Sequence, residues 1–296
     1  MKVVKPIVID AAVLLSSTAA ETYAAYNPAT TYALGERVTL VSTGRIYECV
    51  QAPSLGYAPD ANALWWAIAG PTNRTAMFDG EISTQTVQVS PLTVVLKPGY
   101  VNSLALFGLE GASLDVTVRD GLAGPVVYSR TVSLDGTIIA DWYQYFFEPS
   151  VQLGEVVLTD LPPYGAAHVT VSLTGPGSVK CGSFVLGTFY ALGGTQYGAS
   201  AGIIDYSRKD TSATGTTTFV RRRYSKRMSA PLMLQNAQLN KVQRVLADLR
   251  ATPCAWIGTD TPGFEPLTIF GFYRDFSIDV AYPTTSLCNL EIEGLT

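Results

Sequence analysis

Residues 86–132 read TVQVSPLTVVLKPGYVNSLALFGLEGASLDVTVRDGLAGPVVYSRTV, and apolar and polar residues alternate along most of this run. A period of two is typical of a strand that buries one face. Turn sequences such as Lys97-Pro98-Gly99 and Asp120-Gly121 separate the alternating segments. The same pattern returns at 168–173. Regular short strands with such turns predict an antiparallel, jelly-roll-like β-sandwich over residues 73–192.

Residues 193–296 change character and predict a C-terminal α+β domain. Between Gln235 and Arg250, apolar residues recur at helical spacing and form one stripe, and Pro253 follows. Strand-like segments then return toward the end of the chain. One amphipathic helix laid on a sheet is a complete domain. We expect this domain to mediate assembly.

Residues 1–25 are expected to form a strand or arm that joins the assembly domain. Val3–Ile9 reads as a short strand with Pro6 near an edge position, and a strand this short needs partners from elsewhere in the chain. The same region also resembles a secretory signal, because lysines precede an apolar stretch. Pro6 and Asp10 interrupt that stretch, which favours a retained strand and a protein made in a cytoplasm.

The composition disfavours several functional classes. Lys, Arg, Asp and Glu make up 15% of the 296 residues, and the formal net charge is −4. An acidic chain is a poor whole-surface partner for duplex DNA. So few charges favour a surface that is covered in an assembly, and a homo-oligomer is expected. No apolar run reaches the roughly 18 residues of a membrane span, so membrane insertion is not expected.

Reactive side chains are few and scattered. His168 is the only histidine, and we interpret it as a strand residue that faces solvent or pairs locally. The cysteines are Cys49, Cys181, Cys254 and Cys288, with no closely spaced pair of the kind that binds zinc. We expect free, buried thiols and no catalytic residue, metal site or cofactor. The spacing neither requires nor excludes a disulfide.

The densest aromatic run is Asp141-Trp-Tyr-Gln-Tyr-Phe-Phe-Glu148-Pro149. We interpret it as core and edge packing rather than as a sugar or cofactor site. Asp141 and Glu148 are the acidic residues in aromatic surroundings that a glycosidase would need. Their spacing of seven does not place them across a cleft, so an enzyme is the less favoured reading.

A basic run extends from Phe219 to Met228 and shows strand-like alternation. Residues 211–218 before it are rich in threonine and predict a hairpin loop. The basic run is expected to face an acidic neighbour in an oligomer. A plain solvated face and a nucleic-acid patch are the alternatives, and the acidic chain disfavours nucleic acid. The candidate assembly residues are Arg221, Arg222, Arg223, Lys226 and Arg227.

Residues 26–72 predict a small three-stranded module whose aromatic residues supply most of the core. They resemble the small chitin-binding modules appended to bacterial chitinases. The matching residues are Tyr32, Gly35, Glu36, Val38, Tyr47, Pro59, Trp66 and Gly70. The resemblance implies sugar binding by aromatic residues of the loop after the second strand, which here is residues 50–57 and lacks a tryptophan pair.

Trp65 is the residue in this module most expected to bind glycan, with Tyr57 second. If Trp66 points inward on a strand, its neighbour Trp65 points outward. An outward tryptophan is either a platform for a sugar ring or an anchor against another domain or subunit.

The whole chain resembles a family of minor tail proteins of tailed bacteriophages and prophages. Four stretches carry this resemblance: residues 32–80, Gly202 to Lys209, Arg223 to Met228, and Leu249 through Leu295. It implies a structural virion protein of the tail tip or baseplate, made in the host cytoplasm. Other tail proteins are the implied partners, with host surface glycan as a further one. A stand-alone carbohydrate-binding protein and a glycan-cleaving enzyme are the alternatives.

Overall fold

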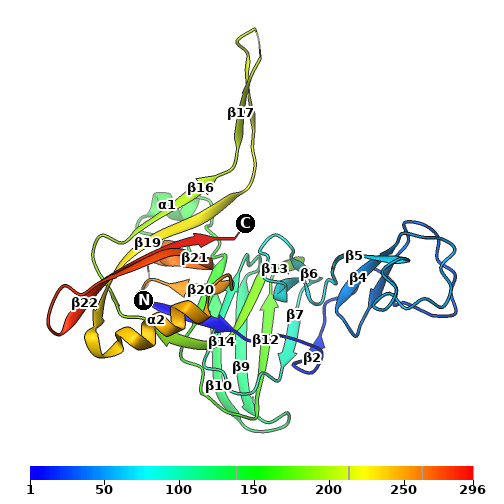
Figure 1. The fold of residues 1–296 in the computed structure, drawn as a ribbon, viewed down its shortest axis with the longest axis horizontal. Coiled ribbons are helices and arrows are strands. Elements are labelled where there is room, and N and C mark those ends of the chain that lie inside the picture. Colours follow the sequence, from blue (N-terminus) through cyan, green and yellow to red (C-terminus); the bar gives the residue numbers. More distant parts are fainter. Residues whose placement is uncertain (138, 213, 262, 296) are drawn as a thin grey trace. The chain divides into compact units, whose positions relative to one another are not determined.

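A computed structural model describes residues 1–137, 139–212, 214–261 and 263–295. Figure 1 shows the fold, and the chain divides into two compact units. Unit 1 comprises Met1–Pro6, Ser103–Ala105 and Val185–Thr296, and unit 2 comprises Ile7–Asn102 and Leu106–Phe184. The chain is 48% strand and 9% helix, which confirms the mainly β, multidomain fold predicted from the sequence.

Unit 2 contains a five-stranded antiparallel sheet in the order β10-β9-β12-β7-β2. Its strands are β2 (Leu14–Ser17), β7 (Leu92–Leu96), β9 (Ser113–Asp120), β10 (Val126–Ser133) and β12 (Ala167–Thr174). Every second side chain of β9 from Leu114 to Val118 is buried, as the alternation in the sequence predicts. Valines face one another across the sheet, with Val171 opposite both Val116 and Val94.

Several shorter elements complete unit 2. Strands β6 and β13 pair with each other as a separate two-stranded sheet. The bounds are β6 (Thr86–Val89), η1 (Ala76–Phe78), α1 (Trp142–Phe147), β11 (Glu155–Leu158) and β13 (Ser178–Cys181). The strands β8 (Ser103–Phe107) and β14 (Ser183–Ala191) each contribute residues to both units.

The aromatic module also belongs to unit 2 and is a three-stranded antiparallel sheet. It consists of β3 (Arg37–Leu40), β4 (Arg45–Cys49) and β5 (Trp66–Pro71). Its buried core is Tyr32, Val38, Tyr47, Cys49 and Trp66. The Trp66 ring meets Tyr32 edge-on at 5.3 Å, and its Nε1 donates to the Tyr57 carbonyl at 2.8 Å. Aromatic area therefore supplies most of this core, in which the other buried apolar residues are Val38 and Cys49.

Unit 1 is built on an antiparallel sheet in the order β14-β1-β20-β21-β22-β19, and β15 and β16 both pair with β19. The bounds are β1 (Lys2–Pro6), β15 (Gly194–Thr195), β16 (Ser200–Asp205), β19 (Tyr224–Gln235), β20 (Cys254–Ile257), β21 (Thr268–Asp279) and β22 (Thr285–Gly294). The short helices η2 (Asn236–Gln238) and η3 (Glu265–Leu267) lie between these strands. The strand predicted at Val3–Ile9 is β1, which ends at Pro6 and pairs on both sides, with β14 and with β20. Only Met1–Pro6 of the arm predicted for residues 1–25 belongs to unit 1, and residues 7–25 belong to unit 2.

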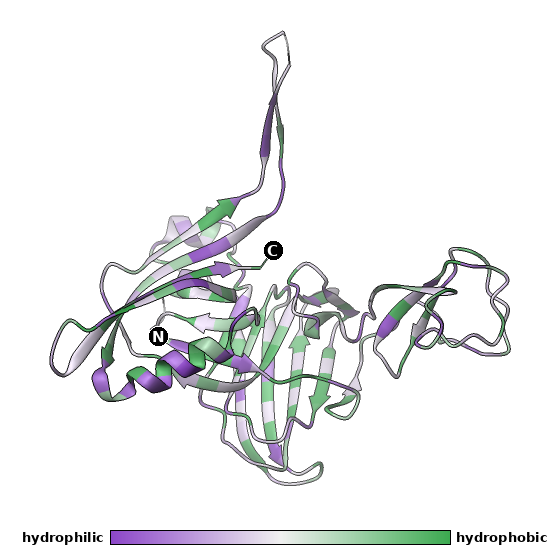
Figure 2. Cartoon of the chain, viewed as in Figure 1, coloured by the Kyte–Doolittle hydropathy of each residue, from purple (hydrophilic) through white to green (hydrophobic). Residues whose placement is uncertain are grey.

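Helix α2 (Leu239–Asp248) packs on the core of unit 1 through Val242 and Leu246, which belong to the predicted apolar stripe. Figure 2 shows its polar and apolar residues on different sides of the helix. The core beneath includes Val3 and Trp256, both fully buried. The Trp256 Nε1 donates to the Gly271 carbonyl at 2.9 Å, so the buried indole keeps its hydrogen bond.

The interpretation of the 141–149 run as core packing is wrong. Residues Trp142–Phe147 form helix α1, and none of its side chains is buried. The Asp141 side chain accepts a hydrogen bond from the Gln144 amide at 2.8 Å, which starts the helix. Five of the six residues of this helix are aromatic, and all five side chains are exposed.

Candidate functional site

A two-stranded hairpin extends from the sheet of unit 1 (Figure 1). Strands β16 and β19 pair from Ser200 opposite Ser229 to Asp205 opposite Tyr224. Beyond that pairing, β17 (Arg208–Thr211) and β18 (Thr217–Val220) pair only with each other in the described part of the chain. The loop predicted for residues 211–218 is too long, because Thr211 belongs to β17 and Thr217 and Thr218 belong to β18. Residue 213 lies outside the described residues. We call residues 208–227 the basic arm.

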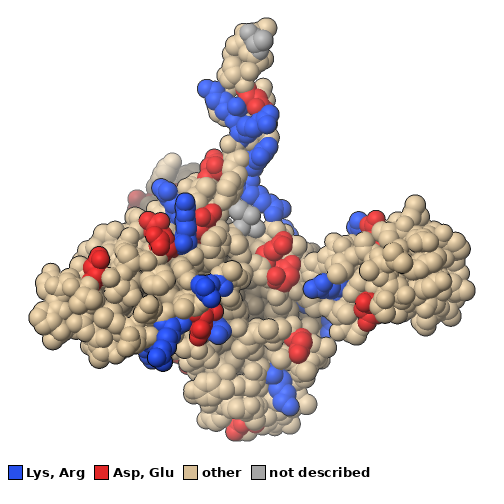
Figure 3. Space-filling model, viewed as in Figure 1, with Lys and Arg blue, Asp and Glu red and all other residues tan. Residues whose placement is uncertain are grey.

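The basic arm concentrates positive charge. It holds seven of the 20 Lys and Arg residues of the chain and a single carboxylate, Asp210. Asp210 is bidentate to the guanidinium of Arg208, at 2.6 and 2.8 Å. Figure 3 shows the cations gathered along the hairpin. An exposed pair of this kind neutralises one charge and leaves the rest of the arm positive.

The predicted assembly residues all lie in this arm, but three of them are not in a strand. Arg221, Arg222 and Arg223 are exposed and form the link between β18 and β19, so the strand-like alternation predicted there is wrong. Side-chain hydrogen bonds replace the pairing between strands at this point. The Ser207 amide donates to the Asp205 side chain at 2.8 Å, and the Ser207 hydroxyl accepts from the Arg222 amide at 3.0 Å.

Lys226 and Arg227 lie in β19, opposite Ile203 and Gly202 of β16. A Cβ at Gly202 would lie 3.2 Å from the Arg227 Nε, so the guanidinium lies across the glycine. Near the link, the hydrogen bonds from Ser207 lower the pKa of Asp205, and Arg221 adds a smaller effect in the same direction. The base of the arm therefore carries a firmly ionised carboxylate among its cations.

The two candidate glycan-binding residues lie together in the aromatic module. The Tyr57 and Trp65 rings stack at 4.2 Å between centroids, with only 9° between their planes. Trp65 lies in the turn before β5, so strand alternation does not set its direction. It packs against the module core and is half-buried, whereas Tyr57 is 39% exposed. Mutual stacking uses one face of each ring.

The thiol and imidazole side chains are buried. All four cysteines are free and buried, as predicted, and burial raises the pKa of Cys181 and of Cys254 to about 12. Thiols with such a pKa stay protonated and unreactive near neutral pH. His168 is buried in β12, with Nδ1 3.0 Å from the Ala166 carbonyl oxygen. Within the described residues, no three His, Cys, Asp or Glu side chains cluster as metal ligands.

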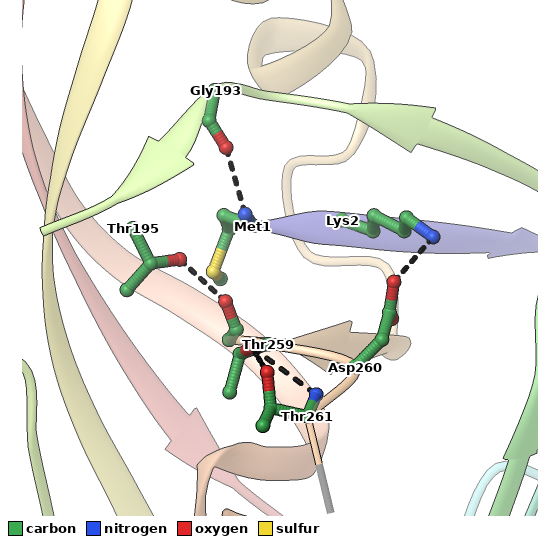
Figure 4. A network of polar contacts seen from close by, with 8 residues as sticks. Met1, Lys2, Gly193, Thr195, Thr259, Asp260 and Thr261 are labelled. Atoms are coloured by element: carbon green, nitrogen blue, oxygen red, sulfur yellow. Dashed lines mark hydrogen bonds and ion pairs between the residues drawn. The ribbon is translucent and has the colours of Figure 1, made fainter.

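A cavity of about 720 Å³ in unit 1, lined by both apolar and polar residues, was missed from the sequence. Figure 4 shows a polar network that includes the lining residues Met1, Lys2 and Asp260, in which the Met1 amine donates to the Gly193 carbonyl at 2.7 Å and Lys2 pairs with Asp260 at 2.6 Å. Burial lowers the pKa of the Met1 amine. The ion pair joins residues 258 positions apart, so no local pattern could reveal this site.

Neither a protein-family model nor a curated protein matches this sequence. No helix in the described ranges is long and apolar enough to cross a bilayer.

Proposed function

We propose that this chain is a structural subunit of a phage tail tip or baseplate that assembles through its basic arm. The arm carries the proposal. A two-stranded hairpin in water is at best marginally stable, because it has no core of its own. Such a hairpin gains order when a partner covers it. Its cations favour a partner surface that is acidic, since complementary charge speeds association and fixes orientation.

The resemblance to tail proteins supplies the biological setting, and the low charge content of the chain supports it. A subunit that is covered by neighbours needs few charges to keep it dissolved. Within this proposal the β-sheets of both units are the rigid scaffold, and the arm is the part that reaches a neighbour. The role assigned to the chain is structural and requires no catalytic group.

The test is to locate the chain in tails purified from the phage or prophage that encodes it. Mass spectrometry and antibody labelling in the electron microscope should find it at the tail end. A variant in which residues 207–222 are replaced by Asn-Gly should remain folded, because a two-residue turn can join Tyr206 to Arg223. It should be lost from tails. Absence of the unmodified chain from purified tails would overturn the proposal.

A second candidate function, glycan binding by the aromatic module, rests on the stacked pair of Tyr57 and Trp65. The outer face of an exposed aromatic ring can stack on the C–H face of a sugar. One such platform should bind only in the millimolar range, near about −4 kcal/mol, and many copies together would then adhere usefully.

Titration of the protein with chitin oligosaccharides tests this second function. The Trp65→Ala variant should lose binding, because removal of the indole also releases Tyr57 from its stack. Tyr100→Ala is the matched control, since Tyr100 is 61% exposed and lies outside the module. If the parent protein does not bind, or if both variants bind like the parent, the glycan function is rejected.

A further inference from the structure

Helix α1 presents an aromatic surface that nothing in its own segment covers. Its aromatic side chains are between 59% and 79% exposed, and they are Trp142, Tyr143, Tyr145, Phe146 and Phe147. They contact one another, with the Trp142 ring stacked on Phe146 at 6.3 Å and the Tyr143 ring tilted against Phe147 at 5.0 Å between centroids. A contiguous group of large exposed apolar residues marks an interaction site. We call residues 141–148 the aromatic segment.

The aromatic segment lies in the most acidic part of the chain. Residues 131–179 contain no Lys or Arg, whereas they contain five acidic residues. Asp141 and Glu148 are two of these and stand at the two ends of α1. Neither forms an ion pair within the described residues. The segment is therefore aromatic in its middle and negative at both ends.

The basic arm has the complementary chemistry. Its link contributes three consecutive guanidinium groups, and it carries exposed aromatic rings of its own in Phe219 (75%) and Tyr224 (53%). Guanidinium groups stack on aromatic faces and form strong hydrogen bonds with carboxylates. The densest positive region and the most acidic region of one chain thus carry matching groups for each other.

We infer that the basic arm of one copy docks on the aromatic segment of a second copy. The inference rests on the proposed assembly function and names the partner of the arm. Arg221 to Arg223 contact the aromatic rings and the carboxylates of Asp141 and Glu148. Because two different surfaces meet, the contact is head-to-tail, and repetition of it closes a ring or extends a chain.

The experiment reverses the charge on each side separately and then mixes the variants. The arm variant is Arg221→Glu with Arg223→Glu. The segment variant is Glu148→Lys with Ser150→Lys, and it keeps Asp141 because that carboxylate caps α1. The matched control is Lys241→Glu with Arg244→Glu, which reverses two exposed charges on α2. Sedimentation equilibrium of the full chain measures association, and circular dichroism checks folding.

The parent and the α2 control should associate, and the affinity of the parent should fall with salt because the charges at the contact are screened. The arm variant and the segment variant should each associate at least about tenfold more weakly. An equimolar mixture of the two variants should recover association, since the reversed arm then meets the reversed segment and the normal arm meets the normal segment. That recovery is specific to contact between two copies.

The inference is overturned if the parent stays monomeric, if the arm variant or the segment variant associates like the parent, or if the mixture of the two variants does not recover association. Salt-dependent binding of a 20-nucleotide DNA by the parent, lost in the arm variant while self-association persists, would assign the arm to nucleic acid instead. Because tail localisation is measured separately, failure of docking leaves the structural role standing, and absence from tails rejects that role even if copies associate.

Discussion

Replacement of Val3 by alanine tests the place of the N-terminal strand in unit 1. The Val3 side chain is fully buried, and residue 3 lies opposite Tyr190 of β14 and Trp256 of β20. Val3→Ala removes two buried carbons, which costs about 1.6 kcal/mol at roughly 0.8 kcal/mol per methylene. The cavity left between two paired strands adds to this, so the loss is about 2–3 kcal/mol in total.

Hydrogen exchange of the β20 amides, followed by mass spectrometry, measures this loss. Since 1.4 kcal/mol corresponds to a factor of ten, protection should fall about 30- to 150-fold. Val8→Ala is the control, because Val8 lies five residues further along and is 84% exposed. It should leave protection unchanged. Exchange within threefold of the parent in Val3→Ala would refute the packing described for β1.

Three further predictions concern stability and reactivity. A thiol reagent at pH 8 should leave the cysteines of the native protein unmodified, because all four are buried and burial raises the pKa of Cys181 and Cys254 to about 12. In urea the same reagent should modify four cysteines per chain. Rapid labelling of the native protein would contradict this prediction. Burial raises the pKa of Asp79 above its ordinary value near 3.8. Between pH 3.8 and the pKa of the folded state, the native protein therefore holds a proton that the unfolded chain has lost. The stability that this proton contributes falls as the pH rises through that range. Asp79→Asn should remove this pH dependence from the free energy of urea unfolding measured between pH 3.5 and 6. The prediction fails if the free energies of the parent and the variant change with pH in the same way. Gly271→Ala should lower the free energy of urea unfolding by about 1–3 kcal/mol, because its Cβ would clash with the Glu293 carbonyl oxygen. Gly194→Ala is the control and should be neutral, since its Cβ would meet only the Gln196 side chain, at 3.8 Å.

Local patterns in the sequence predicted most individual elements. The alternating residues of β9 and the apolar stripe of α2 were identified because burial on one face imposes a period of 2 or 3.6 on the chain. The aromatic core of the module was also predicted, since a small domain has few other ways to bury area. The charge of the basic run alone predicts the candidate assembly residues, and all of them lie in the basic arm. They are Arg221, Arg222, Arg223, Lys226 and Arg227.

The predictions failed where the environment of a residue depends on parts of the chain that are distant in sequence. The aromatic run at 142–147 has the composition of a core segment, yet it forms an exposed helix because the Asp141 cap starts a helix that no sheet covers. Strand alternation predicts that Trp65 points outward, but Trp65 lies in the turn before β5, and its ring stacks on Tyr57. The alternation of the basic run predicts a strand through Arg221 to Arg223. In the structure, hydrogen bonds to the Asp205 and Ser207 side chains interrupt strand pairing there.

The sequence by itself determined which residues alternate, where turns and the one amphipathic helix occur, and where charge is concentrated, because these properties depend on residues within a few positions of each other. Tertiary structure alone decided that β1 pairs with β14 and β20, that Lys2 meets Asp260, and that the aromatic segment is left uncovered. Pairing between distant strands depends on the closure of long loops and on the packing of the whole core, and no local period encodes either one.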